Sequence, residues 1–321
     1  MSPVVRKRAY FAFVAISIIW GTTYFAIKIA LETIPPFAMG GLRYFTGGVI
    51  LALLLRMRGI GLPPVAAWPP LAVIGLLMLG FGNGGVIYAE QFVPSGLAAV
   101  IIATSPFWMT GVQALLSKGE RLNARQALGL VIGFAGIVVL VWPDLVSSFS
   151  IGSRFGVGIL ALQLACIGWA LGSSYAKHVS QTSDVLAGAA MQMIFGGGWM
   201  LLASTVTGEW PRLHFNFATS MSLLYLIVAG SVAGYAAYAY ALKHLPVSTV
   251  SLYAYINPVI AVALGTLLLD EPFHARMLLA AVIIAAGIAI VRSQTRVPPA
   301  DTRAIVVDDA PPEPAPARRA S

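Results

Sequence analysis

Apolar residues run through the chain in long blocks, and short polar stretches separate these blocks. Most blocks have close to the length of about 20 residues that an α-helix needs to cross the hydrocarbon core of a bilayer. The alternating pattern of transmembrane β-strands does not occur in them. The sequence therefore predicts an all-α polytopic membrane protein with ten transmembrane helices. These fall at about residues 10–31, 37–55, 69–89, 96–117, 126–142, 156–176, 184–206, 220–242, 247–269 and 274–291.

The second half of the chain repeats the order of the first half. An apolar run with one internal proline, a polar turn and a second apolar run occur both at 96–141 and at 247–291. Matching residues such as Trp20 and Trp169 lie about 150 residues apart, which indicates an internal duplication. The predicted parts are a cytoplasmic N-terminus (1–9), a first five-helix repeat (10–143), a linker (144–155), a second five-helix repeat (156–292) and a disordered cytoplasmic tail (293–321).

Five is an odd number of spans, so the second repeat enters the membrane from the face opposite to the first. The two repeats are then inverted about an axis in the membrane plane, as in many secondary transporters. Lys and Arg favour cytoplasmic loops. The loops expected on the other side hold only Arg154, Arg212 and Arg276, so both termini are predicted to be cytoplasmic.

The composition agrees with a membrane protein. The chain is 58% hydrophobic and 10% charged, whereas a soluble domain carries about 25% charged residues. The net charge of +8 comes from basic residues at the ends of the apolar runs, so it does not indicate nucleic-acid binding. The single cysteine, Cys166, lies inside an apolar run, which excludes an internal disulfide and a cysteine metal cluster. No cofactor is expected.

Three stretches resemble a known family. The segment IIWGTTYFAIKIALETIPPFAMGGLRYFTGGVILALLL (18–55) resembles the opening of an EamA domain. The segments SPFWMTGVQALLSKGERLNARQALGLVIGFAGIVVL and INPVIAVALGTLLLDEPFHARMLLAAVIIAAGIAIV resemble the closing helices of its two copies. The resemblance covers residues 10–292 and implies a ten-helix carrier of the drug/metabolite transporter superfamily, known mostly for exporters of amino acids and other small metabolites. The second repeat departs from it with Trp169-Ala170 where the first has Trp20-Gly21.

Aromatic residues near mid-span are the first candidates for a solute site. Trp20 and Tyr24 are four residues apart and share a helix face. A buried indole N–H needs a partner, so we interpret Trp20 and Trp169 as walls of a cavity, facing each other across a central space. Ordinary helix packing is the alternative. Lys28, near the end of its span, is expected to snorkel toward the membrane surface.

Polar residues inside the spans are the second group. Arg43 lies about two turns inside its span, where a charge is costly and indicates a function unless the side chain snorkels. It could bind an anion or pair with Glu32 or Glu90. The glycines around Asn83 match G-x-G-x-x-G inside an apolar run, which favours close helix approach or local unwinding over nucleotide binding. The predicted solute-binding residues are Trp20, Tyr24, Arg43, Asn83, Tyr88, Trp108, Trp169, Tyr235, Tyr238, Tyr253 and Asn257.

Acidic residues at the polar turns are interpreted as structural. Glu120 and Asp270-Glu271 are expected to form turns or to cap the helix that follows, with a coupling-proton role as the alternative. No catalytic motif and no converging acid, base or metal group is found, so an enzyme or a scaffold is a poor fit.

The sequence thus predicts a secondary-active exporter of small amphipathic metabolites, amino acids including aromatic ones, in a bacterial inner membrane. A broad drug-efflux carrier is the alternative. Its partners are a small-molecule solute and the lipid bilayer, with no nucleic acid, and a monomer is expected. The solute, the transport direction and the coupling ion stay open.

Overall fold

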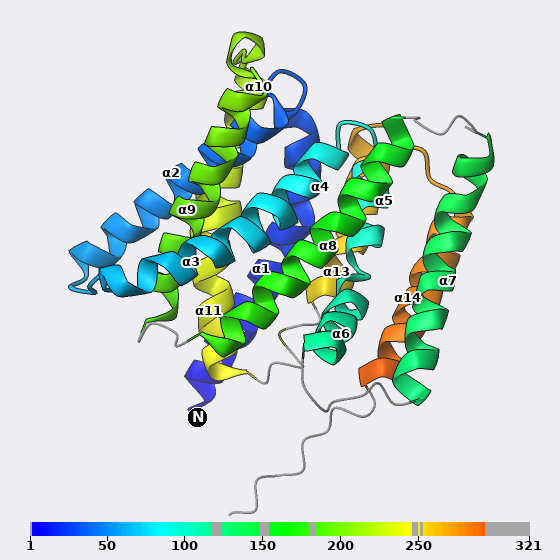
Figure 1. Ribbon diagram of the computed structural model, residues 1–321, viewed down its shortest axis with the longest axis horizontal. Coiled ribbons are helices and arrows are strands. Elements are labelled where there is room, and N and C mark those ends of the chain that lie inside the picture. Colours follow the sequence, from blue (N-terminus) through cyan, green and yellow to red (C-terminus); the bar gives the residue numbers. More distant parts are fainter. Residues whose placement is uncertain are drawn as a thin grey trace, which may run out of the picture.

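A computed structural model describes residues 2–116, 124–147, 154–179, 184–245, 250 and 253–292. Every regular element in these ranges is a helix (Figure 1). Three predicted features lie outside the described residues: the turn residue Glu120, residues 148–153 of the predicted linker, and the predicted tail.

The helices of the first half are α1 (Pro3–Ala30), α2 (Pro36–Met57), η1 (Val65–Ala67), α3 (Trp68–Gly75), η2 (Leu76–Asn83), α4 (Gly84–Ala89), α5 (Ser95–Ile102), α6 (Ser105–Leu116) and α7 (Ala124–Ser147). Those of the second half are α8 (Arg154–His178), α9 (Val185–Val206), η3 (Trp210–Arg212), α10 (Phe217–Tyr225), η4 (Leu226–Ala233), α11 (Gly234–His244), α13 (Tyr253–Leu268) and α14 (Ala275–Arg292).

Seven helical stretches within the described residues are long and apolar enough to cross a membrane: Pro3–Ala30, Pro36–Met57, Val65–Ala89, Ser95–Val112, Arg154–Ala176, Val185–Val206 and Phe217–Ala241. Shorter apolar helices cover Ala127–Leu140, Ile256–Leu268 and Ala275–Ile290. Large apolar side chains remain exposed on the outside of the bundle, among them Phe11 and Val259. Such a surface suits lipid rather than water, and the protein is a polytopic membrane protein.

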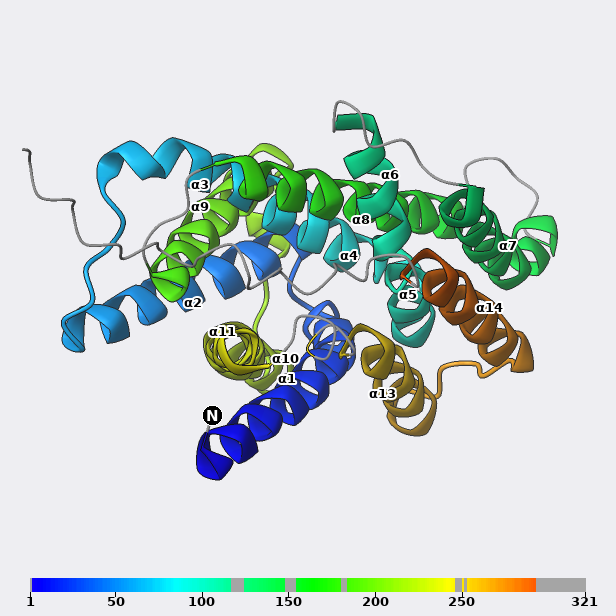
Figure 2. The same cartoon turned by 90° about the horizontal axis from the view of Figure 1, so that it is seen from below.

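The helices pack in pairs of neighbours that are far apart in sequence. Helix α2 packs along α9, and α7 packs along α14 (Figure 1). Helix α1 lies between α11 and α13, as the view from below shows (Figure 2). A Cβ atom added at Gly48 of α2 would lie 2.8 Å from the carbonyl oxygen of Ala190, so glycine is what lets α2 and α9 approach this closely.

Two of the spans contain a π-helical segment. The segment η2 joins α3 to α4, and η4 joins α10 to α11. The two π segments have the same length and lie about 150 residues apart, like the other repeated features of the chain. At the glycines around Asn83 the sequence suggested unwinding or close helix approach. The helix takes the wider π form there, and a Cβ atom at Gly85 would lie 2.9 Å from the Cβ atom of Ala165, so the helices do approach closely at these glycines. The Asn83 amide donates to the Met78 carbonyl oxygen at 3.3 Å.

The span that begins at Ser95 is interrupted near its internal proline. Helix α5 ends at Ile102, and α6 begins at Ser105, because Pro106 has no N–H to continue the hydrogen-bond ladder. Two hydroxyls donate to the carbonyls left at the break, Thr104 to Ile101 and Ser105 to Ile102, both at 2.6 Å. The equivalent Pro258 stays inside α13.

Two carboxylates cap helices of the other half. Glu209 accepts from the N–H of Ala38 at 2.8 Å and so caps the start of α2. Glu271 accepts from the N–H of Ser95 at 2.7 Å, from its hydroxyl at 3.0 Å and from the N–H of Gly96 at 3.2 Å, and so caps α5. The sequence suggested that Glu271 forms a turn or caps the helix that follows it. The structure corrects this, because the chain folds back and places the carboxylate on a helix that starts 176 residues earlier.

Candidate functional site

Four aromatic rings meet where α1 passes α11 and α13. The Trp20 ring lies 5.6 Å from Tyr235, 5.3 Å from Tyr238 and 5.0 Å from Tyr253, measured between ring centroids. Tyr238 and Tyr253 also contact each other edge to face at 6.0 Å. All four rings are half-buried although they lie between helices of the bundle. We call Trp20, Tyr235, Tyr238 and Tyr253 the aromatic cluster.

The indole of Trp20 is fixed by the π segment of the second half. Its Nε1–H donates to the carbonyl oxygen of Gly230 in η4 at 3.1 Å. A Cβ atom at Gly230 would lie 3.1 Å from the Thr23 methyl group and 3.2 Å from Arg43, so the π segment is crowded by α1 and α2 at this point. The indole N–H has thus found the partner that a buried tryptophan requires.

Arg43 reaches the same π segment from α2. It is 4% exposed, and its Nε donates to the Ser231 hydroxyl at 3.3 Å. Its guanidinium lies 4.7 Å from the ring centre of Tyr44, a favourable cation–π arrangement. Arg43 is therefore buried and does not snorkel, and this hydrogen bond goes to Ser231 rather than to Glu32 or Glu90.

Asn257 links α13 to α1 one helical turn beyond Tyr253 of the aromatic cluster. In the amide orientation that satisfies both ends, its nitrogen donates to the carbonyl oxygens of Ser17 at 3.1 Å and Tyr253 at 3.0 Å. The side chain is buried. Asn257 therefore holds the backbone of Tyr253 against α1 and positions one ring of the cluster.

Five of the predicted residues lie elsewhere or only at the border. Trp169 packs on η2, where a Cβ atom at Gly82 would lie 3.3 Å from its ring. Trp108 donates to Gln163 at 2.9 Å. Tyr88 stacks on Phe37 at 5.9 Å. Asn83 bonds within η2, as described above. Tyr24 is half-buried one helical turn from Trp20.

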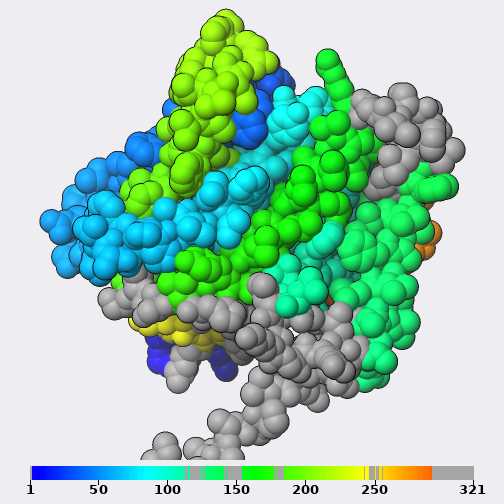
Figure 3. Space-filling view, viewed as in Figure 1, coloured from blue at the N-terminus to red at the C-terminus, as the bar shows by residue number. Residues whose placement is uncertain are grey.

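The two repeated tryptophans make equivalent contacts in one respect. Trp20, from the first half, packs on the π segment of the second half, and Trp169, from the second half, packs on the π segment of the first. The face formed by α3, η2 and α4 runs beside α8, which carries Trp169 (Figure 3). Each tryptophan is thus a contact between the halves.

Lys28 and Glu90 form a second polar region at the end of α1. The Lys28 ammonium donates to the backbone carbonyl oxygens of Glu90 at 2.6 Å and Val93 at 3.3 Å. The ammonium thus satisfies carbonyls left free where α4 ends, just beyond the span Val65–Ala89, and the expectation that Lys28 snorkels stays a prediction. Glu90 itself is 0% exposed.

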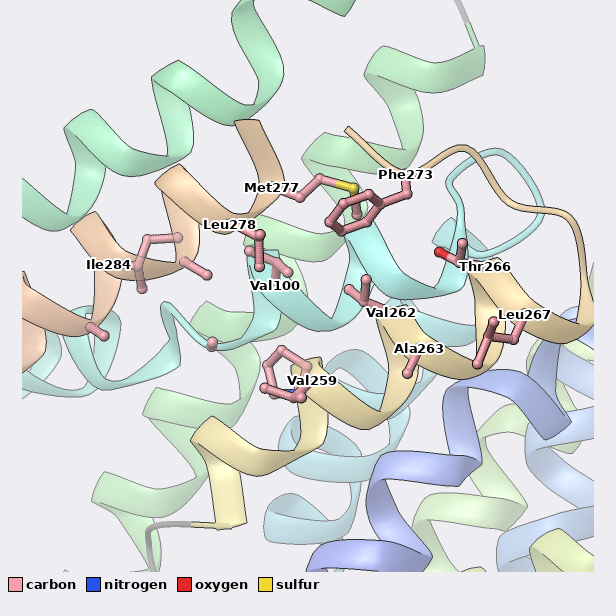
Figure 4. Close-up of a pocket in the computed structure, with 14 residues that line it drawn as sticks. Val100, Val259, Val262, Ala263, Thr266, Leu267, Phe273, Met277, Leu278 and Ile284 are labelled. Atoms are coloured by element: carbon pink, nitrogen blue, oxygen red, sulfur yellow. The ribbon is translucent and has the colours of Figure 1, made fainter. Parts of the chain in front are cut away.

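A separate apolar pocket of about 420 Å³ lies between α5, α13 and α14 (Figure 4). Val262, Ala263 and Thr266 form one wall along α13, while Phe273 and Met277 approach from the other side. None of the eleven predicted solute-binding residues lines it. It opens beside the exposed face of α13, where Val259 is 69% exposed, so it suits an acyl chain or an apolar side chain better than a polar solute.

Comparison with known proteins decides the family. The EamA-like transporter family matches residues 7–142 and 156–293. The chain belongs to this family. It is a membrane transporter, and the family match includes both tryptophans and both π segments.

Relatives of this EamA-like protein carry transporter names. It is 36% identical over 256 residues to the uncharacterized inner membrane transporter YedA of Escherichia coli (strain K12). The aligned region covers 79% of this chain and 81% of the relative. It is 25% identical to a probable amino-acid metabolite efflux pump of the same strain, covering 89% and 94%. A solved crystal structure matches with a TM-score of 0.60 at 21% identity, covering 91% of this chain and 99% of that one, which supports the fold alone.

Sequence reasoning missed two residues of the site in this EamA-like chain, and it named Glu90 only as a possible partner of Arg43 without predicting that it is buried. Ser231 holds Arg43, Gly230 holds Trp20, and Glu90 lies buried beside Lys28. Gly230 and Ser231 carry no signal by themselves, since small residues are common in transmembrane helices. The position of Glu90 was informative, because an acid directly after an apolar run can be buried when a cation from another helix lies beside it.

Proposed function

We propose that this transporter is a secondary-active carrier that exports small amphipathic metabolites, amino acids including aromatic ones, across a bacterial inner membrane. The observation that carries the proposal is the aromatic cluster. Its rings lie between helices and keep part of their surface exposed, which is what a solute-contacting wall requires.

The chemistry of the cluster favours ring-bearing or aliphatic solutes. Aromatic faces bury apolar area without demanding fixed hydrogen-bond geometry, and a few polar groups then orient the solute. The hydroxyls of Tyr24, Tyr235 and Tyr253 and the guanidinium of Arg43 are such groups. Arg43 would attract the carboxylate of an amino acid, since guanidinium and carboxylate match in shape.

The movement we propose is alternating access between inverted repeats. The seven long and three shorter apolar helices would be the ten spans, five in each repeat, with both termini cytoplasmic. The π segments support this reading, because they occur at matching positions in the two halves and each is held by a tryptophan from the other half. π-helical segments are frequent at functional sites, and here they would be the places where the halves shift against each other.

The name of one relative supports the solute class, since it is described as a probable amino-acid metabolite efflux pump. Counterflow in proteoliposomes tests it. Vesicles loaded with unlabelled L-phenylalanine should take up external labelled L-phenylalanine faster than protein-free vesicles. External leucine should compete, and external glucose should not.

Two results would contradict the proposal. Absence of counterflow for every amino acid tested would remove the solute class. Competition by bulky organic cations such as ethidium, without competition by leucine, would instead identify a drug-efflux carrier.

A further inference from the structure

Glu90 is a fully buried carboxyl group that lacks a hydrogen-bond partner among the described residues. It follows α4 directly, one position beyond the apolar span Val65–Ala89. Both of its carboxyl oxygens are enclosed by protein and bond to nothing that the structure describes. A buried acid without a partner is costly in its ionised form, so this arrangement favours the neutral acid.

A cation beside Glu90, Lys28, is engaged elsewhere. The Lys28 ammonium donates to the backbone carbonyl oxygen of Glu90, and not to its carboxyl group. An ionised carboxylate would be expected to attract this ammonium, since paired buried charges bond directly. The contact that Lys28 makes instead is the one expected beside a protonated acid.

The charged and titratable groups around Glu90 come from several elements. Lys28 and Tyr24 face it from α1, Arg43 from α2, and Glu271 from the turn before α14. On α8, Cys166 interacts with Tyr24. Burial raises the pKa of the Glu90 carboxyl well above its ordinary value; Lys28 and Arg43 oppose this rise, and Glu271 adds to it. The group is thus protonated at a higher pH than an exposed glutamate, and nearby cations can stabilise the ionised form once it appears.

Glu90 is also connected to the proposed solute site. Trp20 of the aromatic cluster and Lys28, which donates to the Glu90 backbone carbonyl oxygen, both lie on α1, two helical turns apart. Arg43, which holds the π segment η4, interacts with Glu90 as well. A change in the charge of Glu90 therefore acts on Lys28 and on the helix that also carries Trp20.

We propose that Glu90 is a proton-binding site through which this carrier exchanges protons for solute. When the site opens to the side of higher proton concentration, a proton from water binds the Glu90 carboxylate. When it opens to the other side, the proton returns to water, and Lys28 or Arg43 turns onto the carboxylate. Solute moves in the opposite direction. The inference rests on the proposed transport function, because export against a gradient needs such a driving force.

The experiment uses the full chain in proteoliposomes with labelled L-phenylalanine as the probe. An acidic interior and an alkaline exterior should drive accumulation of the probe, and an ionophore that exchanges potassium for protons should abolish it. Glu90→Gln, which mimics the neutral acid, should keep counterflow and lose the gradient-driven accumulation. Glu32→Gln is the matched control, because Glu32 is exposed, and it should behave like the wild type.

The outcomes separate the two proposals. Counterflow without any response to the pH gradient overturns the proton site and leaves the transport function standing. Accumulation driven by the opposite gradient, or retained by Glu90→Gln, also overturns it. Absence of wild-type counterflow contradicts the transport function itself.

Two further readouts decide the matter if Glu90→Gln transports poorly for structural reasons. A pH-sensitive dye inside wild-type vesicles should report proton efflux when L-phenylalanine is added outside, and no dye response overturns the proposal.

The melting temperature of the purified protein is the second readout. Because the folded-state pKa of Glu90 is raised, the wild type should lose stability as pH rises through that pKa. Glu90→Gln should lose less, and an equal loss in both proteins contradicts the proposal.

Discussion

At the scale of single residues, Trp20 does two things that can be separated. Its ring contacts the three tyrosines of the aromatic cluster, and its N–H occupies the Gly230 carbonyl oxygen in η4. Truncation to alanine would remove both and would open a cavity costing about 3–5 kcal/mol. Trp20→Ala would therefore combine a loss of solute contact with a loss of stability.

Trp20→Phe isolates the hydrogen bond, because an aromatic ring stays in place. We expect a loss of about 1–3 kcal/mol of stability from the unpaired carbonyl, together with slower L-phenylalanine counterflow. The matched control is Trp68→Phe, whose indole donates to the Pro63 carbonyl oxygen at the same 3.1 Å but lies outside the cluster. If Trp68→Phe slowed transport as much as Trp20→Phe does, the effect would be a general loss of packing.

At the scale of elements, helices α2 and α5 begin next to prolines and have no side-chain cap from their own N-terminal residues. Glu209 and Glu271 supply these caps from the second half of the chain. A carboxylate at a helix N-terminus is stabilised by the exposed N–H groups and by the helix dipole. The caps therefore contribute to holding the two halves together in the conformation described here.

Glu271→Gln tests this contribution, since the amide keeps one acceptor oxygen and loses the charge. We expect the purified protein to lose about 1 kcal/mol of stability, seen as a lower melting temperature in detergent. Glu32→Gln should leave the melting temperature unchanged. An unchanged melting temperature for Glu271→Gln would mean that solvent or another group caps α5 equally well.

At the scale of the whole molecule, the two ends of α2 mark opposite ends of the bundle. Glu209 caps the start of α2, so Thr207 lies near that end, while Gly61 follows the other end. The proposed topology places Gly61 in the cytoplasm and Thr207 outside. Both positions are exposed, and the native Cys166 is buried, which keeps background labelling low.

Cysteine labelling tests the topology. Thr207→Cys should react with a membrane-impermeant maleimide in intact cells, and Gly61→Cys only after permeabilisation. The reverse pattern would invert the predicted orientation, and labelling of both from outside would contradict the helix count between them.

The sequence by itself determined the class of the molecule. Hydropathy, the proline positions and the repeated pattern are properties of neighbouring residues, and they were enough to predict an all-helical membrane protein. The resemblance of three stretches to EamA domains then indicated the family. The positions of aromatic residues within the spans led us to predict that Trp20, Tyr235, Tyr238 and Tyr253 bind solute, but did not show that their four rings are in contact. Ten helices and inverted repeats stay predictions.

Only the tertiary structure decided which distant groups bond. The indole of Trp20 reaches Gly230, Glu271 caps α5, and Lys28 donates to the backbone carbonyl oxygen of Glu90. Each of these depends on how helices from the two halves pack, and a hydropathy pattern carries no information about that register. The burial of Glu90 follows from the same packing, because a residue just beyond an apolar span is water-exposed or enclosed according to which helices close over it.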